Sequence, residues 1–120
     1  MTEFDAVVVD TSVIINHLNG RFHLDELSTN AICYSIISYD EIFAYQQLKK
    51  SVRQKIEKML QTMIKVDLDM ELADIAISLR KQYKFKMADA IIAATAEYLR
   101  IPLLSFDLHF ERYPLAIILK

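Results

Sequence analysis

The sequence contains few residues that interrupt regular structure. Its 120 residues include one glycine, two prolines and no tryptophan, so neither a disordered chain nor a loop-rich scaffold is expected. The single cysteine, Cys33, excludes an internal disulfide and a thiolate metal cluster within one copy. No apolar run approaches the roughly 20 residues that span a bilayer, and the first residues are acidic where a secretory signal is basic. We therefore expect a cytoplasmic protein with no membrane segment.

The sequence also lacks a large excess of charge of one sign. Sixteen acidic and fourteen basic side chains give a net charge of -2, which does not provide the bulk positive potential that clamps nucleic acid. This objection weakens if several carboxylates share metal ions, because bound cations reverse the local sign. The length and the 53% hydrophobic content predict one domain, residues 1–120, with a substantial core.

Short apolar runs alternate with helical patterns along the whole chain. Strands are predicted at 4–9, 31–34, 64–66, 103–105 and 115–119. Helices are predicted at 11–18, 38–48, 51–63, 69–83 and 87–99, with Thr11 and Ser12 supplying the N-cap of the first. This alternation predicts an α/β fold of three layers, in which helices cover both faces of a central parallel sheet of four to five strands.

Acidic residues lie near the carboxyl ends of these strands, the edge where open parallel sheets bind ligands. Asp10 follows the first strand, Glu41 lies near the start of the helix after the second, and Asp107 follows the fourth. If these acids share one cleft with Asp89, their repulsion requires cations, and carboxylate oxygens favour Mg²⁺ or Mn²⁺. Such a site activates water and supports phosphodiester hydrolysis.

Asp89 lies in the first turn of the alanine-rich helix. Ile92, Ala93 and Ala96 are three, four and seven residues further on, so this carboxylate shares the apolar, inward face of the helix. An inward charge needs a partner, which supports the metal interpretation. The three histidines, His17, His23 and His109, lack the spacing of zinc sites.

Structural roles are also open for several of these residues. Asp10 could merely end a strand beside a helix cap, and Asp107 could be an ordinary N-cap for residues 108–112. Ser38 and Glu41 have the spacing of a capping box, in which the glutamate bonds back to the serine amide. A first-turn acid at Asp89 suits the helix dipole, but that role does not require an inward position.

Four segments carry a resemblance to a known family. They are Val8–Ile15 (VVDTSVII), Ser35–Glu41 (SIISYDE), Ala88–Ala96 (ADAIIAATA) and Pro102–Asp107 (PLLSFD) followed by His109–Arg112 (HFER). In order and spacing these segments resemble the PIN-domain ribonucleases, and within them the VapC-like toxins. The departures are Ser105 for the usual Thr, and Arg100 and Tyr45 at positions where Gly is common.

The resemblance implies a metal-dependent endoribonuclease that leaves 5′-phosphate and 3′-hydroxyl ends. It implies a homodimer that is inhibited by a small VapB-like antitoxin, whose tail blocks the acidic cleft. Asp10, Glu41, Asp89 and Asp107 would bind Mg²⁺ or Mn²⁺ directly or through water, with His109 an alternative to the last acid. The side chains of Thr11, Ser12 and Ser105 would orient these ligands by hydrogen bonds.

Two other functions are compatible with a parallel α/β fold. A phosphoacceptor signalling module has paired acids near its first strand, an acceptor Asp after its third and a Lys after its fifth, and this chain lacks that set. A catalytically inactive PIN domain could serve only as a binding partner, although the presence of all four acids argues against it.

Overall fold

The computed structural model describes residues 4–44 and 48–120, so Tyr45 and the first three residues lie outside the description. In chain order the elements are β1 (Phe4–Val9), α1 (Thr11–Leu18), the 3₁₀ turn η1 (Leu24–Glu26), β2 (Thr29–Ser35), α2 (Ile36–Ala44), α3 (Lys50–Gln61), β3 (Ile64–Val66), α4 (Met70–Tyr83), α5 (Met87–Leu99), β4 (Leu103–Ser105), η2 (Leu108–Phe110) and β5 (Ala116–Ile118).

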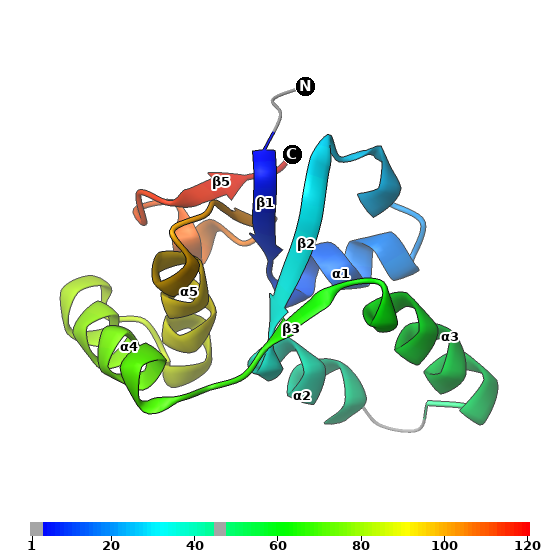
Figure 1. Cartoon of the computed structure of the whole chain (residues 1–120), viewed down its shortest axis with the longest axis horizontal. Coiled ribbons are helices and arrows are strands. Elements are labelled where there is room, and N and C mark those ends of the chain that lie inside the picture. Colours follow the sequence, from blue (N-terminus) through cyan, green and yellow to red (C-terminus); the bar gives the residue numbers. More distant parts are fainter. Residues whose placement is uncertain (1–3, 45–47) are drawn as a thin grey trace.

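Within the described residues the sheet has five strands in the order β3-β2-β1-β4-β5, and every pairing is parallel. The central strand is β1, where Val8 pairs with Cys33 of β2 on one side and Leu103 of β4 on the other. Helices α4 and α5 cover one face, and α1 and α3 lie beyond the other (Figure 1). The predicted three-layer α/β fold is confirmed.

The valines of β1 show why this strand is apolar without alternation. Val8 packs in the cluster that contains α4 and α5, whereas Val7 and Val9 pack in the cluster that contains α1 and α3. All three are at most 1% exposed. A strand covered on both faces has no solvent side, so the period-two pattern of a half-exposed strand is absent.

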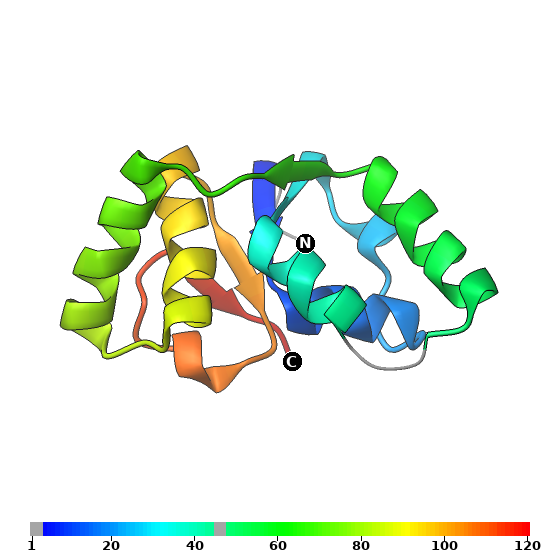
Figure 2. The same cartoon turned by 90° about the horizontal axis from the view of Figure 1, so that it is seen from below.

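The order in which successive strands are added to the sheet reverses between β1 and β4, although all strands are parallel. From β1 it proceeds to β2 and β3 on one side, and it returns to the other side for β4 and β5. The amide of Asp10, just beyond β1, donates to the carbonyl of Leu104 in β4 at 3.1 Å. Figure 2 looks toward this end of the molecule, where the starts of α1 and α5 lie near η2. Parallel sheets bind ligands at such a reversal.

One predicted helix start and one predicted N-cap are wrong, and both errors concern hydrogen-bonding side chains. Helix α2 begins at Ile36, with the Ser35 hydroxyl accepting from the Ile37 amide at 3.1 Å. Ser38 therefore lies inside the helix, and the capping box with Glu41 does not form there. The N-cap of α1 is Asp10 rather than Thr11 or Ser12, because its Oδ1 accepts from the Val13 amide.

Aromatic side chains hold η2 against the connection between α4 and α5. Phe85 of that connection lies 5.4 Å from Tyr83, 5.5 Å from Phe110 and 6.2 Å from Tyr113, measured between ring centroids. The Tyr113 hydroxyl donates toward the Ala93 carbonyl and a Glu97 carboxylate oxygen, each at 3.1 Å. The connection is thereby fixed to the element that follows Asp107.

In the described part of the chain, no helix combines the length and the apolar character that a bilayer crossing requires.

Candidate functional site

Asp10 is a buried carboxylate held by three donors. Its Oδ2 accepts from the Ser105 hydroxyl at 2.5 Å, and its Oδ1 accepts from the Ser12 hydroxyl at 2.5 Å and from the Val13 amide at 3.2 Å. The residue is 4% exposed. These three donors satisfy lone pairs on both oxygens, so the hydrogen bonds favour the ionised form of the carboxylate.

The same two hydroxyls also bind the segment that carries Asp107. Ser105 Oγ accepts from the Asp107 amide at 2.8 Å, and Ser12 Oγ accepts from the Phe106 amide at 3.0 Å. Each hydroxyl therefore uses its hydrogen for Asp10 and a lone pair for the backbone after β4. Ser12 and Ser105 therefore each bond both to Asp10 and to the backbone that leads to Asp107.

Burial raises the pKa of Asp10 above its ordinary value, and the negative charge of Asp107 adds to this increase. The hydrogen bonds from Ser105, Ser12 and Val13 act in the opposite direction but do not cancel it. The carboxylate is thus oriented for ionisation while its environment disfavours the charge. A nearby cation would remove this conflict.

Asp89 and Asp107 lie on either side of His109. The Nδ1 atom of His109 is 3.2 Å from Asp107 Oδ1 and 4.0 Å from Asp89 Oδ2. Burial is the main cause of the raised pKa of Asp89, and the charges of Asp107 and Glu41 raise it further, whereas His109 and Lys86 lower it without cancelling the increase. Asp107 also accepts from the His109 amide at 2.9 Å, so it caps η2 as the structural alternative predicted.

Glu41 reaches the site from α2 through a hydroxyl pair that joins α1 to α2. Thr11 Oγ1 donates to Glu41 Oε1 at 2.6 Å and lies 2.9 Å from the hydroxyl of Ser38. Ser38 is fully buried. Its role was missed from the sequence, where the three-residue spacing to Glu41 indicated a cap. The same spacing places Ser38 one helical turn from Glu41 in α2.

The structure therefore brings the four predicted acids to one end of the sheet. Their charges act on one another: Asp107 on Asp10 and Asp89, and Glu41 on Asp89. Among the described residues, no three Asp, Glu, His or Cys side chains already surround a common point where an ion would bind. The donor set fits a hard cation by its chemistry, because it consists of carboxylate oxygens.

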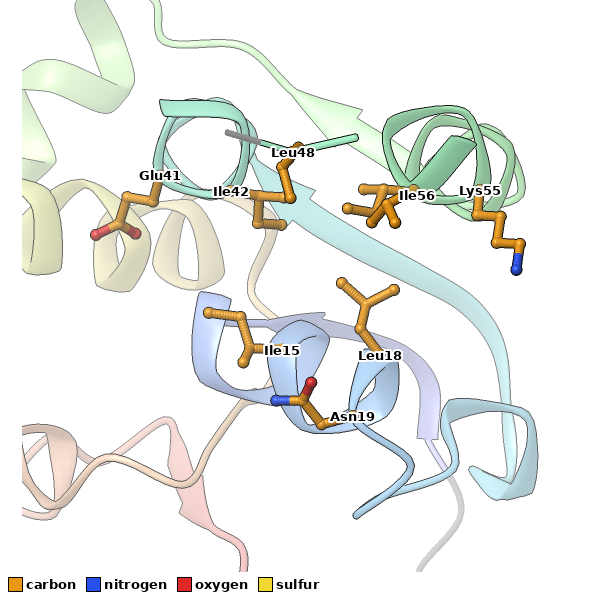
Figure 3. A pocket seen from close by; sticks show the side chains of 9 residues that line it. Ile15, Leu18, Asn19, Glu41, Ile42, Leu48, Lys55 and Ile56 are labelled. Carbon is orange, nitrogen blue, oxygen red and sulfur yellow. The ribbon is translucent and has the colours of Figure 1, made fainter. Parts of the chain in front are cut away.

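An apolar groove lies beside Glu41, between α1, α2 and α3. It has a volume of about 530 Å³. Figure 3 shows Leu18 of α1 and Ile56 of α3 turned toward each other across it, with Glu41 at the end nearest α5. The groove is also lined by Ile15, Asn19, Ile42, Leu48, Val52 and Lys55. Ile15, Leu18 and Val52 are each at least 40% exposed, which is unusual for a cluster of apolar side chains.

Comparison with known proteins identifies a family and one curated relative. Residues 7–115 match the family profile described as the PIN domain. Ribonuclease VapC6 of Methanocaldococcus jannaschii is 37% identical over 79 residues. That alignment covers 63% of this chain and 52% of the relative, so it spans about half the length of the curated protein.

Solved structures share the fold over nearly the whole chain. A toxin–antitoxin complex from Klebsiella pneumoniae matches with a TM-score of 0.82 and 26% identity, over 92% of this chain and 95% of that one. DNA-bound VapBC from Salmonella typhimurium matches with a TM-score of 0.81 and 21% identity, over 97% and 98%. The second similarity concerns the fold alone.

Proposed function

Because this chain belongs to the PIN-domain family, we propose that it is a metal-dependent endoribonuclease and the toxin of a toxin–antitoxin pair. One observation carries the proposal. The buried Asp10 and the segment of Asp107 share the hydroxyls of Ser12 and Ser105 at the sheet reversal, with Asp89 within electrostatic reach. A cap or a strand end does not need this shared network.

Metal dependence is a general property of PIN-domain ribonucleases. In the proposed site Asp10, Glu41, Asp89 and Asp107 hold Mg²⁺ or Mn²⁺, directly or through water. When bound, the metal would supply a nucleophilic hydroxide at neutral pH and stabilise the charge of the phosphodiester. The raised pKa values of Asp10 and Asp89 support this assignment, because their causes are burial and like charge that a cation compensates.

The chain's own residues have separate tasks in this proposal. Ser12 and Ser105 fix the plane of the Asp10 carboxylate, because one bonds to each oxygen. Thr11 fixes one oxygen of Glu41 and leaves the other available. His109 lies beside Asp89 and Asp107, and in this proposal it donates a hydrogen bond to the RNA.

Cleavage of single-stranded RNA by the purified protein, with Mg²⁺ or Mn²⁺ and with EDTA, tests the enzymatic proposal. We expect metal-dependent cleavage that is lost in Asp10→Asn and Asp89→Asn. Asp74→Asn is the matched control, because it removes one exposed carboxylate from α4. Cleavage in EDTA, or full activity in both site variants, would refute the mechanism. Antitoxin binding without any cleavage would instead identify an inactive PIN domain.

We propose that the apolar groove binds a helical segment of a VapB-like antitoxin. The Klebsiella pneumoniae match is described as a toxin–antitoxin complex, and the groove exposes apolar side chains beside an acidic residue. An apolar helix face with a basic residue at its end complements this surface. Leu18→Glu should abolish binding of the antitoxin and retain RNA cleavage, whereas unchanged binding would exclude the groove.

The proposal extends to a homodimer that acts on cytoplasmic RNA. Met70 at the start of α4 is 76% exposed, and a second copy would remove this apolar surface from water. Light scattering of the purified protein measures the state directly, and a monomer at micromolar concentration would reject the dimer.

A further inference from the structure

A cluster of basic side chains lies where α4 turns into α5, outside the acidic site. We call Arg80, Lys81 and Lys84 the basic patch. Together with Ile77 and Phe85 these residues line an open hollow of about 460 Å³. All three cations are exposed, and none forms an ion pair within residues 4–44 and 48–120.

The connection between the two helices fixes the patch to the acidic site. Phe85 packs 5.5 Å from Phe110, which ends the 3₁₀ turn η2 that Asp107 caps. Lys86 follows Phe85, and its charge is close enough to lower the pKa of Asp89. Figure 2 shows this connection beside η2 at the carboxyl end of the sheet. The connection that joins the patch to α5 is therefore packed against the turn that Asp107 caps.

The backbone at Lys84 adds a second observation. Lys84 ends α4 in the left-handed conformation, with φ 59° and ψ 34°. Lysine is strained there, whereas glycine adopts this conformation freely. The strained turn places Lys84 between Lys81 of α4 and Lys86, the N-cap residue of α5.

From this arrangement we propose that the basic patch binds phosphates of the RNA strand next to the acidic site. The inference rests on the proposed ribonuclease function and adds the path of the substrate. The chain carries a net charge of -2, so a local cluster has to supply the attraction that the whole molecule lacks. RNA is favoured over an acidic protein because Phe85, which follows Lys84, packs on the turn capped by Asp107 of the proposed nuclease site.

The basic residues of α3 offer a matched control for this proposal. In Figure 1 α3 lies at the opposite end of the molecule from α4. Replacing Lys49, Lys50 and Lys58 removes the same charge as replacing Arg80, Lys81 and Lys84, and all six are exposed. Lys86 is retained in both variants because its charge acts on Asp89.

Two measurements test the path. Binding of a labelled single-stranded RNA is measured by fluorescence anisotropy in EDTA, and cleavage is measured with Mg²⁺. The triple variant Arg80→Gln/Lys81→Gln/Lys84→Gln should raise Kd and KM about tenfold and leave kcat unchanged. It should also lower the slope of log Kd against log salt by about 2, the loss of three contacts to a single strand. The α3 variant should change Kd less than twofold.

Lys84→Gly separates binding from folding, because it removes a charge and relieves the strained turn. Its melting temperature should stay the same or rise while KM increases. Equal effects of the patch and the α3 variants, or no RNA binding by the wild type, would overturn the inference. If the wild type binds RNA through the patch and does not cleave it, the inference stands and the proposed nuclease function fails.

Discussion

Asp89→Asn should stabilise the metal-free protein and abolish its response to metal. The side chain of Asp89 is 26% exposed, and burial is the main cause of its raised pKa. Because the folded state raises this pKa above the unfolded value, the native protein binds the proton more readily. The free energy of unfolding therefore increases as pH falls through the folded pKa, and at neutral pH the ionised carboxylate lowers it.

The geometry gives the size of the effect. Asp89 Oδ2 and Asp107 Oδ1 lie 4.0 Å and 3.2 Å from the same His109 nitrogen, so these oxygens are at most about 7 Å apart. At an effective dielectric of about 20, two charges at about 7 Å repel by about 2 kcal/mol. Loss of the attraction to His109, Lys86 and the start of α5 offsets part of this gain. The net stabilisation should be about 1 kcal/mol, or about 4 °C in melting temperature.

Metal should reverse the order of the melting temperatures, so that wild type melts above Asp89→Asn. At about 100 times its Kd, a ligand that binds only the folded state adds about 2.7 kcal/mol, which is about 10 °C for a chain of this size. Wild type should gain this increment with Mg²⁺ or Mn²⁺, and Asp89→Asn should gain little. Differential scanning fluorimetry with EDTA and with metal measures both shifts.

Asp74→Asn is the control for a general charge effect, because this carboxylate is exposed on α4. It should leave both melting temperatures within about 1 °C of wild type. A lower melting temperature for Asp89→Asn in EDTA would show that the carboxylate contributes to folding. An undiminished metal shift in that variant would show that Asp89 is not a ligand.

Ser105→Ala should lower kcat or metal affinity about 10- to 100-fold, because Asp10 loses its Oδ2 donor; Ser105→Thr should retain activity, and wild-type kinetics in Ser105→Ala would contradict the positioning role. Tyr113→Phe should lower the melting temperature by about 4 °C, the loss of about 1 kcal/mol of hydrogen bonding to Ala93 and Glu97, and should leave kcat unchanged. Arg100→Gly should raise the free energy of unfolding, measured by urea denaturation, by about 0.5 kcal/mol, because Arg100 has a φ of 58° that glycine adopts without strain. A decrease would show that the Arg100 side chain stabilises the helix end.

The order of elements and the identity of the acids could be predicted because they depend on local patterns. The range 87–99 of α5 was predicted to the residue, since its alanine-rich face and the following Pro102 mark both ends. The hydrogen-bond partners could not be predicted in the same way. Ser105 bonds to a residue 95 positions away, and this contact follows from the pairing of β4 with β1, which no local pattern specifies.

The start of α2 and the N-cap of α1 were predicted wrongly for a related reason. Ser35, Ser38, Asp10 and Thr11 are all good capping residues by type, and the sequence alone does not say which side chain is used for the cap. In the structure Asp10 both caps α1 and accepts hydrogen bonds from the hydroxyls of Ser12 and Ser105. The apolar groove was also missed, although Ile15 and Leu18 have the spacing of one helix face, because the partner surfaces on α2 and α3 are remote in sequence.

The bond between Ser105 and Asp10 has a consequence for synthesis of the protein. It joins the start of the chain to a residue in its last sixth, so the complete set of Asp10 donors cannot exist until β4 has left the ribosome and paired with β1. A partly synthesised chain lacks Asp107 and His109 as well. The acidic site is therefore assembled only after β4 has been made, and a chain that is arrested during translation or clipped before residue 105 carries no complete site.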